Sequence, residues 1–549
     1  MPKSLLIHHR NVVDTGKFDT QIIFESTGNV DTYVQTKILP ELEKAEFDII
    51  FIKDNLSSNY LELYGIALVY HIRLSRELGD KRFVPIGIIS DIDACVLNRL
   101  DVMANILFTE NIFLVSNQTE QISYFIKKTK EHIDKLDEKR FLSAITVEPP
   151  KETSHDIANE WAMYKWATLL DVKTDATMEN KNSIKSMLYF KYLLAFNPVD
   201  EVKALDQKRP KSSGKILYID DEWARGWKDI LEVYFHNTDV GFETFEKDFK
   251  DAKSFSLRNE IKEKVKLYDP DLVLLDLRLV ANDHTDTKRE NIEMYTGIQV
   301  REAIKEVNPG IQVIMFTATS KSLILEKLYE HNILGYIKKE HPLDINISTK
   351  ENITKLALLI DKGMEKKYLK EVWEIQERIM DLSVLKEVTL TYGEENKLLE
   401  LKNSIPVTFE ILNSNIPRPF VYGMFSIYKC IEIICEYYIE EHHDSTTKKY
   451  KGYWRGTRTP IDNNKSDTST NNKTKQILKK LAINDDLNDS LNKIVCSRNY
   501  EIHGGEIKYN CQDYVIKIPG YEDIIDWFTM LETILVGMNI SYSNKAGDF

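Results

Sequence analysis

Carboxylates, a hydroxyl and an ammonium stand at the ends of four short apolar segments in the middle of the chain. Asp220 and Asp221 end the first segment, Asp276 the second and Thr317 the third, and Lys339 follows the fourth. A parallel sheet gives this pattern because its strands are buried on both faces and its polar side chains gather at their carboxyl ends. Clustered carboxylates repel one another unless a cation lies among them, and hard oxygen ligands suit Mg²⁺. The pattern therefore predicts an α/β domain with a Mg²⁺ site at one edge of its sheet.

In this order, these residues resemble the receiver domain of response regulators over about residues 215–345. The resemblance implies that Asp276 accepts a phosphoryl group from a histidine kinase or another phosphodonor. It also implies that Mg²⁺ is the cofactor, held by Asp220, Asp221, Asp276 and the backbone carbonyl of Arg278. Phosphorylation adds roughly −1.5 to −2 charges, which is enough to bias a loop between two states of similar energy. The implied role is a phosphorylation switch.

Three further residues complete the implied switch. Thr317 and Tyr336 are expected to move together toward the phosphoryl group, and the Lys339 ammonium to pair with a carboxylate or with the phosphoryl oxygens. Two features depart from the family pattern, because Glu340 stands where proline usually follows the lysine and the loop over residues 280–292 is long. We expect that loop to gate phosphodonor access or to dock a partner. A receiver fold with an intact but unused site is the alternative.

A degenerate copy of the same pattern occupies residues 1–118. Alignment of the apolar segments puts Lys53 at the phosphoacceptor position and puts His9 and Arg10 at the acidic pair. Because lysine cannot accept a phosphoryl group, we predict a pseudo-receiver that binds or dimerises without chemistry. A shift of one residue would put Asp54 at the acceptor position instead, but it would turn the strand inside out. The five expected strands lie at residues 5–8, 21–24, 47–52, 84–89 and 106–108.

A second chemical motif lies near the end of the chain, where Arg498, Asn499 and His503 precede two glycines. It resembles the motif of HEPN-type ribonucleases, and residues 395–549 supply a similar helical setting. The resemblance implies that His503 acts as general base toward a ribose 2′-hydroxyl, that Arg498 holds the scissile phosphate and that Asn499 orients the histidine. It implies metal-independent cleavage of RNA at a homodimer interface. Five residues span about 500° of helical rotation, so Arg498 and His503 meet only if the last turn deforms or a second subunit contributes.

Cations alternate with aromatic residues shortly before this motif, in a polar insert at residues 441–474 that we interpret as a loop. Such mixtures are typical of contacts with single-stranded RNA, because bases stack on aromatic rings and phosphates pair with cations. A solvated basic loop is the alternative. The predicted RNA-binding residues are Lys448, Lys449, Lys451, Trp454, Arg455 and Arg458.

Composition sets broader limits on the chain, which has 549 residues and a net charge of −13. That charge gives no global signature of nucleic-acid binding, so a basic surface must be local. The five cysteines form no Cys-x-x-Cys pair, and we interpret them as buried free thiols of a cytoplasmic protein. The N-terminal apolar run is too short for a signal peptide, and no apolar stretch reaches about 18 residues, so no membrane contact is expected.

The chain is expected to form a multidomain α/β plus all-α protein, with two flavodoxin-like parallel sheets and a C-terminal helical bundle. The expected divisions are a degenerate receiver-like domain at 1–118, a helical bridge at 119–205, a receiver at 215–345, a helical linker at 346–394 and a HEPN-like domain at 395–549.

Together these features predict a regulated effector, in which a receiver controls a HEPN-type endoribonuclease through phosphorylation or a partner. By analogy, such a fusion suggests a bacterial stress or anti-phage role. The alternative is a non-enzymatic signalling scaffold whose helical domain only dimerises or binds a partner. No convincing helix-turn-helix or strongly basic helix favours a DNA-binding output.

Overall fold

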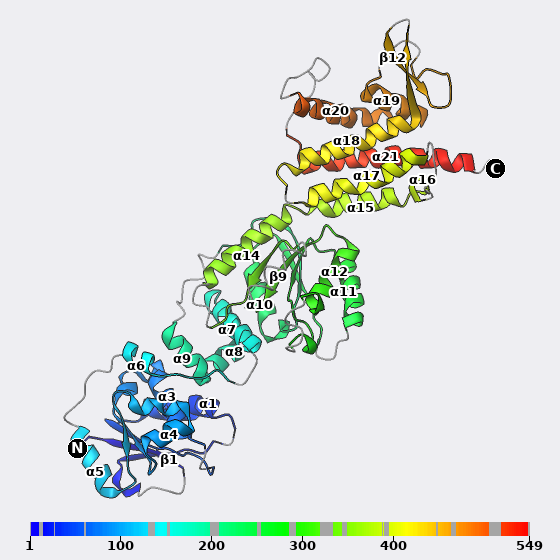
Figure 1. Cartoon of the computed structure of the whole chain (residues 1–549). Coiled ribbons are helices and arrows are strands. Elements are labelled where there is room, and N and C mark those ends of the chain that lie inside the picture. Colours follow the sequence, from blue (N-terminus) through cyan, green and yellow to red (C-terminus); the bar gives the residue numbers. More distant parts are fainter. Residues whose placement is uncertain are drawn as a thin grey trace.

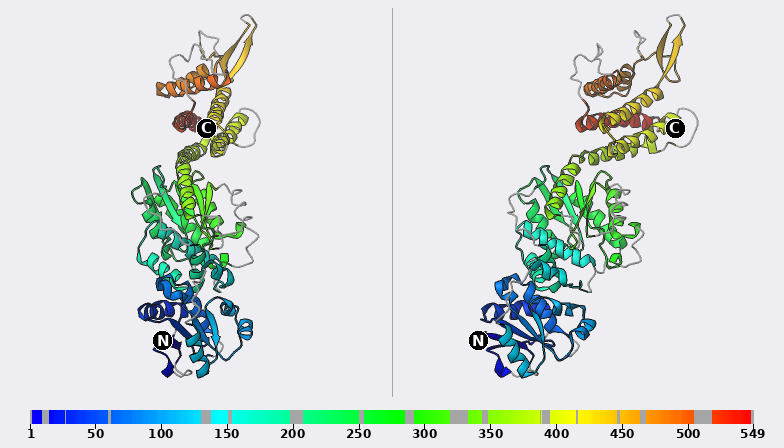
Figure 2. Two further views of the ribbon diagram at one scale, coloured as in Figure 1. Left: turned by 90° about the vertical axis from the view of Figure 1, so that its left-hand side faces the viewer. Right: turned by 60° about the vertical axis from the view of Figure 1, so that its left-hand side comes forward.

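Three parts follow one another in space as they do in sequence, with an α/β domain at the N-terminal end, a second α/β domain in the middle and a helical part at the other end (Figures 1 and 2). The structure is a computed structural model. It describes the chain except for residues 1, 10–14, 27, 60–61, 130–137, 151–153, 198–207, 250–253, 285–291, 319–332, 343–347, 387, 389–394, 415, 446–447, 463–467, 504–517 and 547–549.

The first domain contains a parallel sheet of five strands in the order β2-β1-β3-β4-β5. The strands are β1 (Ser4–His8), β2 (Thr20–Ile23), β3 (Ile49–Lys53), β4 (Ile86–Ile89) and β5 (Ile112–Val115). The helices around it include α1 (Val30–Tyr33), α2 (Leu39–Lys44), α3 (Tyr64–Leu74), α4 (Ala94–Leu100) and α5 (Thr119–Lys128). Four of the predicted strands are confirmed. The fifth is wrong, because residues 106–108 end a 3₁₀ helix (Val102–Phe108), in which Ile106 and Leu107 are buried.

The middle domain repeats this topology with strands in the order β10-β9-β8-β6-β7, all parallel. The strands are β6 (Gly214–Ile219), β7 (Val240–Thr244), β8 (Leu272–Leu275), β9 (Gln312–Thr317) and β10 (Gly335–Lys338). Its helices include α10 (Trp227–Phe235), α11 (Ser254–Tyr268), α12 (Thr296–Val307) and α14 (Thr349–Met364). The two sheets confirm the predicted pair of flavodoxin-like domains, whose site chemistry belongs at the carboxyl ends of the strands.

One glycine occupies the same place in each α/β domain, at the helix that lies against the end of the central strand. The amide N–H of Gly65 donates to the Asp54 carbonyl, and that of Gly297 donates to the Leu277 carbonyl, each at 3.0 Å. A Cβ on Gly297 would lie 2.3 Å from the Asp276 carbonyl oxygen, and one on Gly65 would lie 2.0 Å from that of Lys53. Glycine is therefore what allows each helix to begin so close to this strand.

We expect Gly297→Ala to destabilise the middle domain by about 1–3 kcal/mol, because the added methyl group must push α12 away from the strand end. The measurement is the midpoint of denaturant unfolding. Gly28→Ala is the matched control, since a Cβ there meets nothing within 4 Å. Equal midpoints for the two variants would contradict the close approach.

The helices between the sheets divide differently from the sequence-based boundaries. Helix α5 packs its Ile122 against the first sheet, so this domain continues past residue 118. Bridge helices α8 (Asp175–Ser186) and α9 (Leu188–Phe196) also bury apolar residues in the first core. The expected linker at 346–394 does not form a separate element, because α14 covers the middle sheet and α15 (Tyr368–Met380) joins the C-terminal core. Both helices are amphipathic, and each buries its apolar stripe in a different domain.

The C-terminal part is a helical bundle centred on α18 (Pro419–Tyr438), as expected (Figure 1). The polar insert that we interpreted as a loop instead begins as an antiparallel hairpin of β11 (Ile439–Asp444) and β12 (Lys449–Trp454), which projects from the helices (Figure 2). The remaining helices are α16 (Ser383–Lys386), α17 (Glu395–Asn413), α19 (Thr470–Lys480), α20 (Asn488–Ile502) and α21 (Tyr521–Ala546).

Helix α21 is the one described helix that is long and apolar enough to cross a membrane, over Tyr521–Ser541. In the structure it packs against α15 and α18 and buries Trp527, Phe528 and Leu531 in the bundle core. This burial is what the core helix of a globular domain shows.

The cysteines differ in part from the expectation of buried free thiols. Cys430 and Cys435 are buried and free, whereas Cys95 is free but exposed. Cys496 is disulfide-bonded, so the expectation is wrong for this residue. Cys511 lies outside the described residues.

Candidate functional site

The three predicted metal-binding carboxylates come together at the carboxyl edge of the middle sheet. One carboxylate oxygen each of Asp220, Asp221 and Asp276 lies within 4.8 Å of the other two. Asp220 and Asp221 follow β6, and Asp276 follows β8, which is the neighbouring strand in the sheet. Asp220 and Asp276 are fully buried. Three carboxylates at this spacing are a donor set that fits Mg²⁺, whose charge would offset their repulsion.

Asp220 is held in place by three hydrogen-bond donors. Its Oδ2 accepts from the Lys339 ammonium at 2.8 Å and from the Tyr218 hydroxyl at 2.7 Å. Its Oδ1 accepts from the Glu222 backbone N–H at 2.8 Å. Burial alone would lower the pKa of Lys339, but the Asp220 and Asp276 carboxylates outweigh it and the pKa is raised. The lysine therefore carries a fixed positive charge beside the acidic cluster.

Asp276, the predicted phosphoacceptor, has one bound and one open oxygen. Its Oδ1 accepts from the Leu277 backbone N–H at 2.7 Å, whereas its Oδ2 has no hydrogen-bond partner among the described residues. Burial and the Asp220 carboxylate raise the pKa of Asp276, and the Lys339 ammonium opposes them. Burial and the carboxylates of Asp220 and Asp276 also raise the pKa of Asp221. A bound cation would reverse both effects, because it favours the ionised forms.

The predicted switch residues lie on the two strands next to this cluster. Thr317 ends β9 and is fully buried, and its backbone carbonyl accepts from the Lys339 N–H at 2.8 Å. Tyr336 lies on β10, half-buried, with the Lys355 ammonium 4.3 Å from its ring centroid. The half-buried tyrosine ring therefore lies near the surface, from which the predicted switch would move it toward Thr317. Residues 319–332, which follow Thr317, lie outside the described residues.

The long loop after Asp276 is fastened at its start by a buried carboxylate. Asp283 is 1% exposed and accepts backbone N–H groups from Leu279, Val280 and Thr296 at 3.0, 3.2 and 3.2 Å. These bonds tie the loop to the beginning of α12. The Arg278 guanidinium lies 5.7 Å from the Tyr295 ring, and its predicted role concerns only its backbone carbonyl. Residues 285–291, the middle of the predicted gate, lie outside the described residues.

Sequence reasoning missed Asn159, which reaches this site from a distant part of the chain. It lies on bridge helix α7 (Ser154–Leu169), yet its Oδ1 accepts from the Lys339 ammonium at 3.0 Å. Asn159 is fully buried, and it precedes Lys339 by 180 residues. Nothing in the local pattern around Asn159 links it to a receiver site. The available signal was weak, namely a polar residue between the apolar residues Ile157 and Trp161, because such a group needs a partner once it is buried.

The first domain has a cation where the middle domain has its acceptor. The register pairs Ile52 with Ile7, as Leu275 pairs with Ile219, so Lys53 corresponds to Asp276 as predicted. The same register places His8 and His9 at the acidic pair, one residue earlier than the predicted His9 and Arg10, because the apolar run of β1 already ends at Ile7.

The side chain of Lys53 is already satisfied in this degenerate site. Its ammonium pairs with the buried Asp54 carboxylate and donates to the Ile89 carbonyl at 3.2 Å. Asp54 in turn accepts a hydrogen bond from Ser90, the counterpart of Thr317. An ion pair therefore fills the place of the metal and the acceptor, and the alternative with Asp54 at the acceptor position is wrong.

The second predicted chemical motif lies at the end of α20. Arg498 donates to Asn499 Oδ1 at 3.0 Å, and its guanidinium lies 5.0 Å from the Tyr428 ring of α18. His503 caps the helix, with its backbone N–H donating to the Asn499 carbonyl at 3.0 Å, and its side chain is exposed. The last turn stays helical as far as Ile502. These contacts direct Arg498 toward α18, which leaves a second subunit as the predicted way to bring an arginine to His503.

The predicted RNA-binding residues divide into exposed and structural groups. Lys448, Lys449 and Arg458 are exposed at and beyond the hairpin, and Lys451 is half-buried on β12. These exposed cations lie where RNA could reach them, at and beyond the projecting hairpin.

Trp454 and Arg455 instead make contacts within the domain. The Lys480 ammonium lies 3.9 Å from the Trp454 ring centroid. The Arg455 guanidinium donates to the carbonyls of Glu436 and Tyr437, which end α18 without helical partners. These two residues therefore fasten the hairpin to the bundle, and RNA contact by them would compete with that role.

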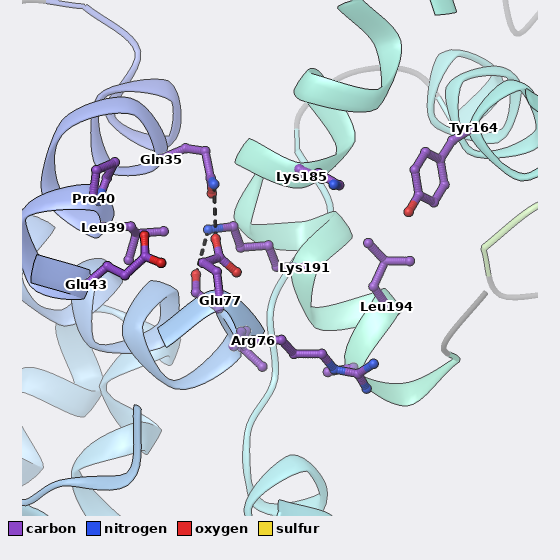
Figure 3. Close-up of a pocket in the computed structure, with 13 residues that line it drawn as sticks. Gln35, Leu39, Pro40, Glu43, Arg76, Glu77, Tyr164, Lys185, Lys191 and Leu194 are labelled. Carbon is purple, nitrogen blue, oxygen red and sulfur yellow. Dashed lines mark hydrogen bonds between the residues drawn. The ribbon is translucent and has the colours of Figure 1, made fainter. Parts of the chain in front are cut away.

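A cavity of about 530 Å³ lies apart from the acidic cluster, between the first domain and the bridge (Figure 3). Lys191 of α9 reaches it and donates to the Ser75 hydroxyl at 2.8 Å, and burial lowers the pKa of Lys191 to about 8. On the opposite side, Gln35 donates to Glu77 at 3.0 Å. Tyr164 of α7 points into the same space (Figure 3). Helix α7 thus borders both this cavity and the acidic cluster.

Comparisons with known proteins bear on the first domain. Residues 8–115 match the family model of the inactive receiver domain. Among solved structures, a two-component response regulator of the LuxR family from Aurantimonas sp. SI85-9A1 is 18% identical, over 27% of this chain and 86% of that one, with a TM-score of 0.20. No curated protein matches the chain. The family match shows that the first domain is similar to inactive receivers, as the pseudo-receiver prediction expects, and a receiver-like domain indicates a role in signalling.

Proposed function

We propose that this chain is a phosphorylation-controlled signalling effector, in which phosphoryl transfer to Asp276 regulates RNA cleavage by the C-terminal helical domain. The observation that supports the control input is the buried cluster of Asp220, Asp221 and Asp276 beside the ammonium of Lys339. The first domain, with Lys53 at the acceptor position, serves as a binding partner for the middle one. A histidine kinase or another phosphodonor supplies the phosphoryl group.

Phosphoryl transfer uses the open oxygen of Asp276. Oδ2 attacks the phosphorus atom, a P–O bond forms to Asp276, and the bond from phosphorus to the donor's leaving group breaks. Mg²⁺, held by the three carboxylates and the Arg278 carbonyl, would neutralise charge on the transferring group. Lys339 supplies a second positive charge from the end of β10, and the Thr317 hydroxyl would donate a hydrogen bond to the transferred phosphoryl group.

The proposed output is metal-independent endoribonuclease chemistry at the end of α20. His503 takes the proton of a ribose 2′-hydroxyl, whose oxygen attacks the adjacent phosphorus and displaces the 5′-oxygen of the next nucleotide, which takes up a proton from water. The products are a 2′,3′-cyclic phosphate and a 5′-hydroxyl end. Arg498 contacts the scissile phosphate, and Asn499 orients the histidine. Because Arg498 faces α18 within one chain, the complete site requires a homodimer. A bacterial stress or anti-phage role in the cytoplasm follows by analogy.

The contacts of Arg498 also favour a second candidate function. A guanidinium packed on Tyr428 and bound to Asn499 serves equally well in a non-enzymatic scaffold, where α20 only supports dimerisation or a partner surface. In that case the receiver still accepts a phosphoryl group, and the bundle changes its assembly state rather than cleaving RNA.

Incubation of the full chain with total RNA separates the two functions. The arms are protein alone, protein with Mg²⁺ and beryllofluoride (a phosphoryl analogue), and protein with EDTA. We expect cyclic-phosphate ends to appear, to persist in EDTA and to change in rate with beryllofluoride. Intact RNA in every arm, together with a change in assembly on adding beryllofluoride, would support the scaffold instead.

A further inference from the structure

Bridge helix α7 contributes apolar side chains to two hydrophobic cores at once. Its Ile157, Trp161 and Tyr164 belong to the first core, where Trp161 stacks on Phe190 of α9 with ring centroids 6.0 Å apart. The spacing of four and three residues puts these side chains on one face. The opposite face is apolar as well.

The opposite face of α7 packs into the middle domain. Met163 and Trp166 lie in its core, and the Trp166 ring meets Trp227 and Phe316 edge-on, each at 5.7 Å between centroids. A helix buried on both faces cannot move relative to one domain without disturbing its contacts with the other.

Two polar bonds from this second face reach the phosphorylation site. The Trp166 indole N–H donates to Glu340 Oε2 at 3.0 Å, and burial raises the pKa of Glu340. The glutamate that stands in place of the family's proline therefore has a structural role, because its carboxylate binds the Trp166 side chain of α7. Seven residues earlier, Asn159 Oδ1 accepts from the Trp227 indole N–H at 2.6 Å and from the Lys339 ammonium at 3.0 Å. Both partners are donors, so the oxygen of the amide must face them.

The contact of Asn159 with Lys339 lies where phosphorylation changes the charge. The ammonium now divides its hydrogen bonds between Asp220 and Asn159, at 2.8 and 3.0 Å. A phosphoryl group on Asp276 adds roughly −1.5 to −2 charges beside it and competes for the same three N–H donors. Asn159 is the neutral partner of the two, so its hydrogen bond is the weaker and is lost first.

We propose that Asn159 is a positioning residue of the phosphorylation site, through which helix α7 senses the state of Asp276 and transmits it to the inactive receiver. In the unmodified protein Asn159 holds Lys339 toward Asp220 and so fixes α7 on the middle domain. Phosphorylation draws Lys339 away from Asn159 and weakens the packing of α7 on the middle domain. The contacts of α7 with α8 and α9 then loosen as well. This inference rests on the proposed phosphorylation of Asp276 and does not depend on the nature of the C-terminal output.

Amide hydrogen exchange of the full chain, with and without Mg²⁺ and beryllofluoride, tests the inference. In the unsubstituted protein, beryllofluoride should speed exchange in Ser154–Leu169 and Leu188–Phe196. Asn159→Leu keeps the side-chain size but removes the acceptor, so exchange there should already be fast and should not respond to beryllofluoride. Asn159→Asp adds a charge that competes for Lys339 and should weaken beryllofluoride binding by about 5-fold or more.

The matched control is Asn180→Ala, because Asn180 is a buried asparagine of the same bridge that donates to the Glu160 carbonyl instead of reaching the acidic cluster. It should leave both the response and the binding unchanged. Beryllofluoride binding without any change of exchange in α7, or an unchanged response in Asn159→Leu, would overturn the inference alone. Failure of the unsubstituted protein to bind beryllofluoride would instead overturn the proposed phosphorylation and the inference with it.

Discussion

Asp276→Asn is expected to abolish the binding of beryllofluoride, because an amide cannot provide the anionic oxygen that the analogue and the phosphoryl group require. Fluorine NMR of the bound analogue in the presence of Mg²⁺ measures this directly. The substitution also removes one of three carboxylates within 4.8 Å of one another, so the folded protein in EDTA should be at least as stable as the parent. A loss of binding in a variant with an unchanged or raised Tm therefore reports chemistry rather than unfolding.

The same variant should alter the pH dependence of stability without Mg²⁺. The raised pKa of Asp276 means that the folded state binds a proton more tightly than the unfolded state does. Its contribution to stability is therefore full at acidic pH and is lost as pH rises through the raised pKa, and asparagine removes it. Asp54→Asn is the control for the first domain and should leave beryllofluoride binding intact. Retained binding in Asp276→Asn would show that the acceptor lies elsewhere.

His503→Ala is expected to lower RNA cleavage by about 10²–10⁴-fold, which is the usual contribution of a general base. The backbone N–H that caps α20 stays in place, so the fold should not change. The measurement is the rate at which cyclic-phosphate ends form. His236→Ala is the control, because this exposed histidine of the middle domain lies outside the motif.

A second variant separates the arginine's chemistry from its packing. Arg498→Lys keeps the positive charge near Tyr428 but loses the planar fork that grips a phosphate, so cleavage should fall while Tm changes little. Cleavage that survives in both His503→Ala and Arg498→Lys would rule out this motif as the nuclease site and would favour the scaffold.

The sequence predicted best what strands alone determine. Asp220, Asp276 and Thr317 each end an apolar run, and the parallel sheet brings such ends together whatever lies between them. The position of Lys53 followed from the same rule, since its strand is buried on both faces. The prediction of His9 and Arg10 at the acidic pair was wrong by one residue, because the apolar run of β1 is too short to fix its own register. Only the pairing of β1 with β3 shows that His8 and His9 lie there.

What the sequence could not supply was the packing between parts. Asn159 and Lys339 meet only because α7 lies across the middle domain, and no periodicity within α7 says which domain covers which face. Residues 346–394 failed as a linker for a related reason. Two amphipathic helices in succession look alike in sequence, yet α14 covers a sheet and α15 joins a bundle. Partner identity is a tertiary property that local patterns do not carry.

Helix α7 also bears on how the middle domain can be handled in the laboratory. Because Met163 and Trp166 fill its core, the middle domain is discontinuous in the chain and draws on a helix that ends some 45 residues before its first strand. A fragment that starts at the first strand, β6, would lose that helix and expose Trp227 and Phe316 to water. For the same reason, replacing Glu340 by proline would leave the Trp166 indole N–H without its carboxylate partner. The two α/β domains should therefore be expressed as one piece.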